Sequence, residues 1–358
     1  NDKTLVIYSE GAMFYQYFDE IIDYVLKNSE LEINYLTSDF DDPVFKKTDK
    51  RLKTFYIKNT LNSVIAKLDK SLLVMTMTDL GQFYIKRSQN NVNHVYVFHA
   101  LVSTHFTYRL GAFDNYDTIF CVGSHHVKEI KKTEEIYKLP AKKLIESGYS
   151  RIEKIYNNHQ EYLKTAKNEN KVNILIAPTW GEGNIVETCV KELATTLATD
   201  TKNHIVIRPH PETKKRNPAI MKQLTGYFKK YENINLELDL TSQVSIHNAD
   251  ILITDWSGIA YEYAFGTERP VLFINTARKL ENNAEWEKLQ IEPIDISLRN
   301  KIGKAVELSE ISTISEIVSD FLKSRDKYKK EIVKSREECM FNWMKSSEVS
   351  GKYIIDLC

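Results

Sequence analysis

Short apolar runs alternate with longer stretches of helical spacing along most of the chain. Leu5–Tyr8 is apolar, and the apolar side chains of residues 14–27 recur as they would on one face of a helix. The same pattern predicts further strands in the first half, at residues 33–36, 54–57, 71–78, 95–98, 118–122 and 144–145. Helical spacing is also predicted after residue 78 up to Arg87, and over residues 126–137.

The pattern restarts after a polar, charged stretch at residues 157–171. Strands are predicted at 172–177, 204–208, 234–238, 250–254 and 271–274, and helices at 184–197, 218–231, 242–248, 259–265 and over most of 314–344. Strands that alternate with helices form parallel sheets, so the chain is of the α/β class. Because 358 residues exceed one small core, we expect a domain of residues 1–160, a second of residues 161–315, and C-terminal helices in residues 316–358.

The segment from Ala249 to Glu262 carries the clearest candidate chemistry. A strand ends at Asp255, turns through Ser257 and Gly258, and opens a helix. We expect Ser257 to cap that helix, so that its hydroxyl and the following amides form an anion site. Gly258 lets a ligand approach the backbone, and Glu262 can accept hydrogen bonds from ribose or polyol hydroxyls. An ordinary strand-to-helix turn with a structural cap fits the same residues.

Two histidines follow predicted strands in different halves of the chain, where α/β proteins bind ligands. His210 lies between two prolines and beside Arg208, whose planar fork suits phosphate; His210 itself can donate to phosphate or take a proton. His99 is the first polar side chain after its strand, so it can act as a general base in a cleft between the domains. His105 competes for that role, and a lone histidine of this kind is more often structural.

Composition narrows the class of partner. Lys+Arg and Asp+Glu are 49 each, so no global field favours nucleic acid. Cys121 and Cys189 lie in apolar segments and are predicted to be buried, reduced thiols, which fits the cytosol. The sequence contains no apolar run of about 18 residues, no signal peptide and no metal-binding motif. The start at Asn1 without Met fits a fragment of a longer protein.

Taken together, the segments resemble the CDP-glycerol glycerophosphotransferase family, the enzymes of teichoic acid polymerisation and priming. The matching pieces run in the family's order from residue 95 to 275: Gly148-Tyr149-Ser150-Arg151, Ala177-Pro178-Thr179-Trp180, Arg208-Pro209-His210-Pro211, and Asp250 to Gly258 with Glu262-Tyr263-Ala264 and Arg269-Pro270. His99 stands where the family has its catalytic histidine, between different neighbours. Ser150, Gly258 and Glu262 also replace the family's residues, so the chain resembles a divergent member.

The resemblance implies a GT-B fold, with two Rossmann-like parallel-sheet domains facing across a cleft. The N-terminal domain would hold the acceptor and the C-terminal domain the CDP-activated donor. An acceptor hydroxyl would attack the β-phosphorus of CDP-glycerol or another CDP-polyol, and CMP would leave. His99 would be the base. His210 would be the second catalytic residue, as a donor to the leaving phosphate. The donor would be bound by a larger set, with Glu262 at its ribose or polyol hydroxyls and the others at its phosphates, namely Arg208, Thr179, Asp255, Ser257 and Gly258. His105 and Arg151 would lie on the acceptor side.

Two alternatives remain open at this point. One is a nucleotide-sugar glycosyltransferase of the same GT-B architecture, and the other is a non-catalytic scaffold. The family also implies a glycan or lipid-linked acceptor in cell-envelope, teichoic acid or capsule synthesis. It further implies a cytoplasmic protein in peripheral contact with the inner face of the plasma membrane. The sequence requires no cofactor, although Mg²⁺ is compatible with it.

Overall fold

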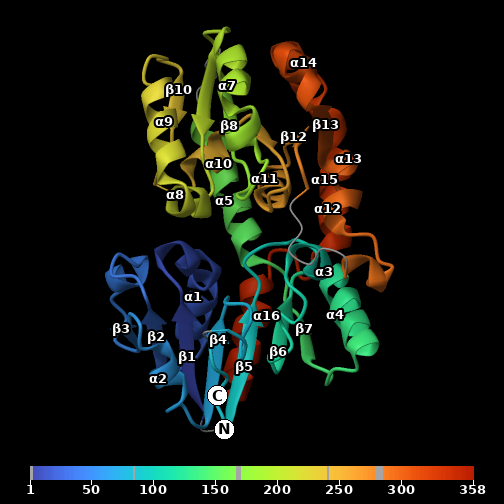
Figure 1. Cartoon of the computed structure of the whole chain (residues 1–358). Helices are drawn as coiled ribbons and strands as arrows, with labels where there is room; N and C mark the ends of the chain where they lie inside the picture. Colours follow the sequence, from blue (N-terminus) through green and yellow to red (C-terminus); the bar gives the residue numbers. More distant parts are fainter. Residues whose placement is uncertain (1–2, 84, 167–170, 240–241, 279–284) are drawn as a thin grey trace. The chain divides into compact units, whose positions relative to one another are not determined.

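The computed structural model describes residues 3–83, 85–166, 171–239, 242–278 and 285–358. These residues form two compact units (Figure 1). The first unit is Asn1–Arg151 with Glu281–Ile291 and Glu338–Cys358, and the second is Ile152–Leu280 with Glu292–Glu337. The division therefore falls after Arg151, near the start of helix α5 (Ser150–Thr165) and before the boundary predicted at residue 160, and residues 316–337 belong to the second unit.

The first unit is built on a seven-stranded sheet of order β3-β2-β1-β4-β5-β6-β7, in which all neighbouring strands are parallel. Its strands are β1 (Thr4–Ser9), β2 (Ile33–Thr37), β3 (Leu52–Tyr56), β4 (Ser71–Met75), β5 (Val92–Val97), β6 (Thr118–Cys121) and β7 (Lys143–Glu146). Its helical segments are η1 (Ala12–Tyr17), α1 (Asp19–Asn28), η2 (Pro43–Lys46), α2 (Leu61–Ile65), α3 (Thr104–Thr107), α4 (Ser124–Tyr137), η3 (Trp286–Leu289) and α16 (Ser346–Leu357).

The C-terminal helix α16 completes the core of the first unit. Ile354 of α16 is buried with Ile22 and Val25 of α1 against Ile7 and Val74 of the sheet. A side chain at Gly351 would overlap the Tyr24 ring, so α16 and α1 lie in close contact. The chain thus returns to the first sheet after it has built the second unit.

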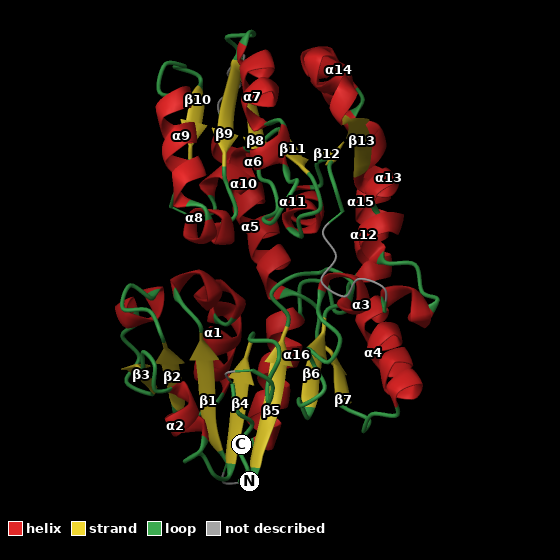
Figure 2. Cartoon of the chain, in the orientation of Figure 1, coloured by secondary structure: helices red, strands yellow, loops and turns green. Residues whose placement is uncertain are grey.

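The second unit is built on a six-stranded parallel sheet of order β10-β9-β8-β11-β12-β13 (Figure 2). Its strands are β8 (Val172–Ile176), β9 (Asn203–Ile207), β10 (Ile234–Leu236), β11 (Ile251–Thr254), β12 (Val271–Asn275) and β13 (Gly303–Glu307). Its helical segments, besides α5, are α6 (Ile185–Thr188), α7 (Val190–Ala198), α8 (Pro211–Arg216), α9 (Pro218–Phe228), α10 (Val244–Asn248), α11 (Ile259–Thr267), α12 (Ile294–Ser297), α13 (Arg299–Ile302), η4 (Leu308–Thr313), α14 (Ile314–Lys323) and α15 (Arg325–Cys339).

The alternation predicted from the sequence is confirmed, with two corrections. The helix expected up to Arg87 is wrong: Asp79, Gly81 and Phe83 have left-handed φ values of 63°, 76° and 46°, which a right-handed helix does not contain. Strand β13 was not predicted. Cys121 and Cys189 are buried free thiols, as expected.

The strand order reverses once in each sheet, between β1 and β4 and between β8 and β11. Ligands of open α/β sheets bind at this reversal, outside the carboxyl ends of the strands. In the second unit, this position brings together the loops that follow β8 and β11, where Thr179 and Asp255 lie. In the first unit, it is where η1 and Thr76 lie, beside the end of β5 at His99. None of the helices in the described residues is long and apolar enough to cross a membrane.

A single glycine allows β13 to join the second sheet, and this can be tested. Gly303 pairs with Val271, and a Cβ at Gly303 would overlap the Val271 carbonyl. We expect Gly303→Ala to lower the free energy of unfolding by about 1–3 kcal/mol, as overpacking does. The measurement is urea unfolding followed by circular dichroism. Gly226→Ala is the matched control, because a Cβ there meets open space on α9 and should stabilise by about 0.5–1 kcal/mol. Equal stability of the two variants would contradict the assignment.

Candidate active site

Asp255 ties together three segments at the carboxyl edge of the second sheet. The side chain is fully buried. Its Oδ1 accepts the amides of Thr179 (2.7 Å) and Trp256 (2.8 Å), and its Oδ2 accepts the amide of Ile185 (3.0 Å). Burial raises the pKa of the Asp255 carboxyl, and the three amides oppose that shift by stabilising the charged form. Asp255 therefore holds the loops, whereas the sequence had predicted that it contacts phosphate.

The turn that Asp255 begins presents backbone amides. Trp256, Ser257, Gly258 and Ile259 are all partly exposed. The described part of the chain supplies no acceptor for the amides of Ser257, Gly258 and Ile259. These amides precede α11, so they point toward the site favoured by anions at a helix N-terminus. The predicted anion turn is thus present as backbone geometry.

The cap of α11 corrects one detail of the prediction. Gly258, not Ser257, occupies the N-cap position, and no side chain caps the helix. The helix begins one residue later than a Ser257 cap would place it, so the Ser257 hydroxyl is not used in capping. Glu262 lies in the first turn of α11 and is buried.

His210 lies at the end of β9 with its tautomer set by the backbone. It caps α8, and its Nδ1 accepts the amide of Glu212 at 3.1 Å. A neutral imidazole that accepts at Nδ1 carries its proton on Nε2. Trp180, from the loop after β8, lies beside it with ring centroids 6.2 Å apart, and Arg216 stacks on the Trp180 ring at 4.5 Å. This geometry makes His210 a hydrogen-bond donor through Nε2.

Arg208, predicted to bind phosphate, makes hydrogen bonds within the second unit. Its Nη1 donates to Glu237 Oε2 (2.8 Å), to the Ser242 carbonyl (2.8 Å) and to Ser245 Oγ (3.3 Å). The guanidinium is buried in this ion pair and joins β9 to the segments around β10 and α10. The predicted phosphate fork is therefore engaged in holding the sheet edge.

In the first unit, His99 lies within a cluster of aromatic rings. Phe14, Tyr17 and Tyr108 surround it at centroid distances of 6.0, 6.1 and 5.9 Å. Its Nδ1 lies 3.3 Å from the Tyr96 hydroxyl, and its ring also hydrogen-bonds to the backbone of Thr76. Burial lowers the pKa of His99 to about 4, so the imidazole is neutral at neutral pH.

Arg151 belongs to the same cluster as His99. Its guanidinium lies over the Tyr17 ring at 5.4 Å and donates to Gln16 Oε1. Tyr17 thus touches both predicted residues. No sequence motif marks Phe14, Gln16 or Tyr17 as site residues. The polar residues Ser9-Glu10-Gly11, where β1 ends, are the signal that could have located this segment.

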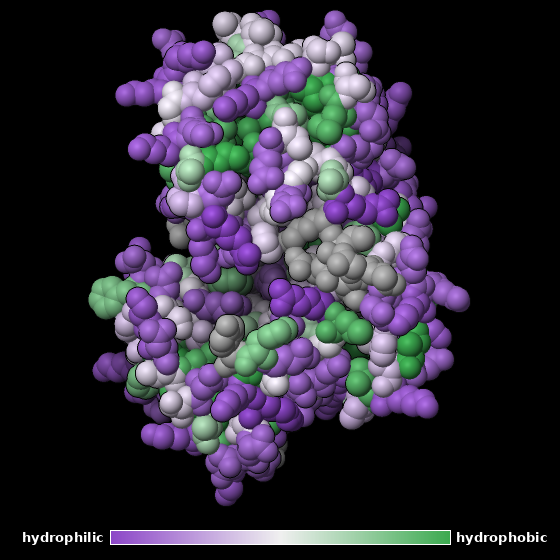
Figure 3. All heavy atoms as spheres, in the orientation of Figure 1, coloured by the Kyte–Doolittle hydropathy of each residue, from purple (hydrophilic) through white to green (hydrophobic). Residues whose placement is uncertain are grey.

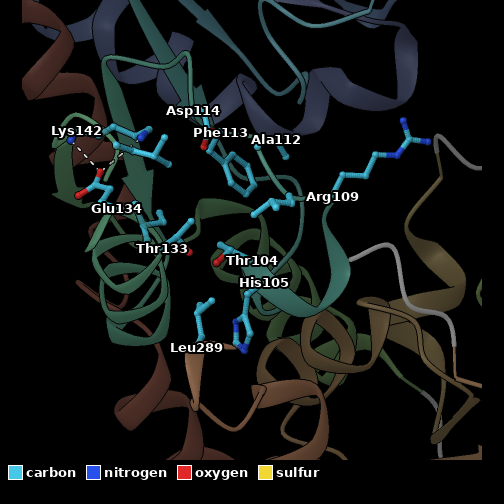
Figure 4. A pocket seen from close by; sticks show the side chains of 14 residues that line it. Thr104, His105, Arg109, Ala112, Phe113, Asp114, Thr133, Glu134, Lys142 and Leu289 are labelled. Atoms are coloured by element: carbon cyan, nitrogen blue, oxygen red, sulfur yellow. Dashed lines mark hydrogen bonds and ion pairs between the residues drawn. The ribbon is translucent and has the colours of Figure 1, made fainter. Parts of the chain in front are cut away.

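His105 is held apart from this cluster by its own partners. The side chain is buried, with Nε2 3.1 Å from the Ile291 carbonyl and Nδ1 3.5 Å from Glu129 Oε2. Glu129 also accepts the amide and the hydroxyl of Thr104. His105 lines a small pocket with Thr104, Phe113, Thr133 and Leu289, and the Glu134–Lys142 ion pair lies at its edge (Figure 4). The Phe113 ring packs 4.9 Å from the Tyr96 ring, so this pocket borders the His99 cluster.

The structure thus groups the predicted residues within each unit. His99 and Arg151 meet around Tyr17, while Thr179, Asp255, Ser257 and Gly258 meet at the carboxyl edge of the second sheet. Among the described residues, no group of three or more His, Cys, Asp or Glu side chains has the arrangement of a metal site.

Comparisons with known proteins identify the family and the fold. Residues 2–280 match the family of CDP-glycerol:poly(glycerophosphate) glycerophosphotransferases. No curated protein matches in sequence. A structure of the wall teichoic acid polymerase TagF soaked with CDPG superposes with a TM-score of 0.67 at 14% identity, covering 99% of this chain and 88% of that one.

Other solved structures share the fold. A UDP-GlcNAc 2-epimerase from Neisseria meningitidis bound to UDP-GlcNAc gives a TM-score of 0.59 at 14% identity, over 99% of this chain and all of that one. At such identity the likeness shows the fold alone, which is of the GT-B type with two parallel-sheet α/β domains. The family match spans most of the chain, so this protein belongs to the CDP-glycerol:poly(glycerophosphate) glycerophosphotransferase family and is an enzyme of that type.

Proposed function

We propose that this enzyme transfers glycerol phosphate from CDP-glycerol to a hydroxyl of a polymer acceptor, with His99 as the base and the second unit as the donor site. The acceptor oxygen attacks the β-phosphorus, the bond from that phosphorus to the bridging oxygen breaks, and CMP leaves. The hydroxyl proton passes to His99. The observation that carries the donor assignment is the turn that Asp255 holds at the strand reversal, whose amides at Ser257, Gly258 and Ile259 have no acceptor among the described residues.

On the donor side, fixed backbone amide dipoles bind the phosphates, rather than a mobile charged side chain. The amides of Ser257, Gly258 and Ile259 can donate to phosphate oxygens without reorganising, because Asp255 fixes the turn from behind. His210 Nε2–H adds a further donor from β9. Glu262 and Thr179 lie beside the turn, where Glu262 would accept from ribose or polyol hydroxyls.

His99 suits a base because it is neutral. Burial lowers its pKa to about 4, so nearly every molecule at neutral pH can accept a proton. The aromatic rings around it hold the partly exposed imidazole in place, which favours proton transfer from a positioned hydroxyl. Arg151, within this cluster, and His105, in the neighbouring pocket, are proposed to lie along the acceptor.

The donor groups are hydrogen-bond donors rather than oxygen ligands, so we propose that the protein itself binds no catalytic metal. Mg²⁺ prefers carboxylates, phosphates and water, and the carboxylate of Asp255 is committed to backbone amides. Any Mg²⁺ would arrive on the diphosphate of the donor.

We also propose a cytoplasmic protein in peripheral contact with an anionic membrane surface, where a lipid-linked acceptor would be presented. The support is an aromatic patch on the first unit, made of Phe40, Phe45 and Tyr56, which are 76%, 40% and 44% exposed. Their rings touch, with Phe40 6.3 Å from Phe45 and 5.8 Å from Tyr56. Exposed ammonium groups of the same segment, at Lys46, Lys50 and Lys58, complement anionic headgroups.

The patch lies where β2 and β3 end, since Phe40 follows β2, Phe45 belongs to η2 and Tyr56 is the last residue of β3. Hydrophilic side chains cover much of the molecular face drawn in Figure 3, with hydrophobic ones scattered among them. Aromatic rings with a polar tip or neighbour favour the membrane–water interface. The aromatic patch is therefore expected to contribute to vesicle binding.

The first prediction concerns the donor and the base. The wild type should release CMP from CDP-glycerol with an acceptor, and release little UDP from UDP-sugars. His99→Ala should lower kcat at least about a thousandfold, a loss at the scale of general-base catalysis, while the Kd for CDP-glycerol changes less than twofold. Rates by coupled CMP detection and affinities by calorimetry check this.

His204→Gln is the matched control, because His204 is an exposed histidine on β9 outside the proposed machinery. Turnover of His99→Ala at the wild-type rate would show that another group is the base. Release of UDP rather than CMP would favour the glycosyltransferase alternative, and no turnover with any donor would favour the scaffold.

The second prediction concerns pH. A base works only when unprotonated, so lowering its pKa extends activity toward acid. We expect kcat/KM to stay level from pH 8 to about pH 5 and to fall below that with an apparent pKa near 4. An ordinary histidine would already lose activity near pH 6.5. Circular dichroism at each pH confirms that the protein stays folded, and an acid limb near 6.5 would contradict the assignment of His99.

The third prediction concerns the membrane. The variant F40S/F45S/Y56S should bind phosphatidylglycerol vesicles at least about tenfold more weakly, because each ring contributes of the order of 1 kcal/mol at an interface. Cosedimentation with anionic and with neutral vesicles measures this. Phe83→Ser, which removes a ring that is 73% exposed elsewhere on the first unit, is the control. Unchanged binding by the triple variant would refute the proposal, and a change in oligomeric state would mark the patch as a contact between copies.

A further inference from the structure

The Asp255–Gly258 turn is also held from its buried side by an arginine of a later segment. Arg299, the first residue of α13, is only 6% exposed. Its Nη1 donates to the Asp255 carbonyl and its Nη2 to Asn275 Oδ1, both at 2.8 Å. One guanidinium therefore links the turn after β11 to the end of β12.

The same guanidinium packs between aromatic rings. Its central carbon lies 4.0 Å from the centroid of Trp256 and 4.4 Å from that of Phe273. Trp256 in turn donates from Nε1 to the Thr276 carbonyl at 3.1 Å. The Trp256 side chain is thus fixed at both its ring face and its nitrogen, and the backbone of the turn is fixed with it.

Arg299 brings a buried positive charge to this place. Within the described ranges, its hydrogen bonds go to a carbonyl and an amide oxygen rather than to a carboxylate, and the carboxylates of Asp255 and Asp295 attract it at longer range. Burial lowers the pKa of Arg299 to about 10, so it is still charged at neutral pH. A buried cation is costly unless its charge is compensated, and an anionic ligand at the turn would add to the compensation that these two carboxylates supply.

We propose that Arg299 is a positioning residue of the donor site: it sets the backbone of the Asp255–Gly258 turn and places a permanent positive charge behind the amides that receive the donor diphosphate. The inference rests on the proposed function of that turn. Arg299 lies beyond residues 2–280, the part that matches the family. Neither the family match nor the segments identified in the sequence assign it a role.

The chemistry explains why this position needs arginine. A guanidinium can donate to two acceptors in a plane and stack on rings at the same time, whereas the ammonium of lysine is a point charge without a stacking face. Lysine would keep the charge and lose the geometry. Methionine would keep much of the volume between the rings and lose the charge and both hydrogen bonds.

The test measures CDP binding by calorimetry at two salt concentrations, together with the melting temperature. Arg299→Met should weaken CDP binding at least about thirtyfold and flatten the dependence of Kd on salt. Arg299→Lys should lose less affinity and keep the wild-type salt dependence. Asn275→Ala removes the acceptor of Arg299 Nη2, together with a hydrogen bond from the Asn275 amide to Glu307, and should weaken CDP binding about two- to fivefold in a folded protein.

Arg336→Met is the matched control. Arg336 is also a buried arginine that donates to a backbone carbonyl, that of Phe265, and lies over an aromatic ring, Tyr156. It contacts the opposite end of α11 from the turn. Its loss should lower the melting temperature as much as the loss of Arg299 and change the CDP affinity less than twofold.

The outcomes separate the inference from the function on which it rests. A wild type that does not bind CDP would overturn the donor assignment itself. Wild-type affinity in Arg299→Met, or in Arg299→Lys and Asn275→Ala if the methionine variant does not fold, would overturn the role of Arg299. An equal loss of affinity in Arg336→Met would reduce that role to general stability.

Discussion

The donor side of this enzyme depends on one buried carboxylate. Asp255 accepts amides from the loop after β8, from the start of α6 and from its own turn, so three segments meet at one side chain. An unpaired carboxylate in this position would be costly, and the amides compensate it. The next amides along the turn, those of Ser257, Gly258 and Ile259, have no acceptor among the described residues. The anion site is a consequence of how the charge of Asp255 is satisfied.

The two units prepare their chemistry by different physical means. The second unit uses backbone dipoles, and its buried charges either form ion pairs, as Arg208 does with Glu237, or pack between rings, as Arg299 does. The first unit uses desolvation: the aromatic rings around His99 shield much of the imidazole from water and keep it neutral. In the proposed mechanism, binding a diphosphate needs donors that do not reorganise and accepting a proton needs a neutral base, so each unit would supply what its half of the reaction requires.

Several site residues could be found from the sequence because they lie on local signals. Asp255 and Gly258 follow a buried strand and open a helix, and His210 is enclosed by prolines at a strand end. Their partners could not be found in this way. The sequence around Arg208 suits a phosphate fork, but the folded chain pairs Arg208 with Glu237. Ser257 suits a helix cap, but Gly258 takes the N-cap position of α11. Tyr17 and Arg299 are far in sequence from the residues that they position.

The sequence by itself determined the class of the molecule: hydrophobic periodicity fixes strands and helices, their alternation fixes parallel sheets, and the motifs identify the family. Tertiary structure decided what each polar side chain does. It turned Asp255 and Arg208 into residues that hold loops, joined α16 to the first core and placed Arg299 behind the turn. The physical reason is the distance along the chain over which each property is decided. Periodicity is a property of neighbouring residues, whereas a buried charge takes its role from whichever partner the folded chain brings to it.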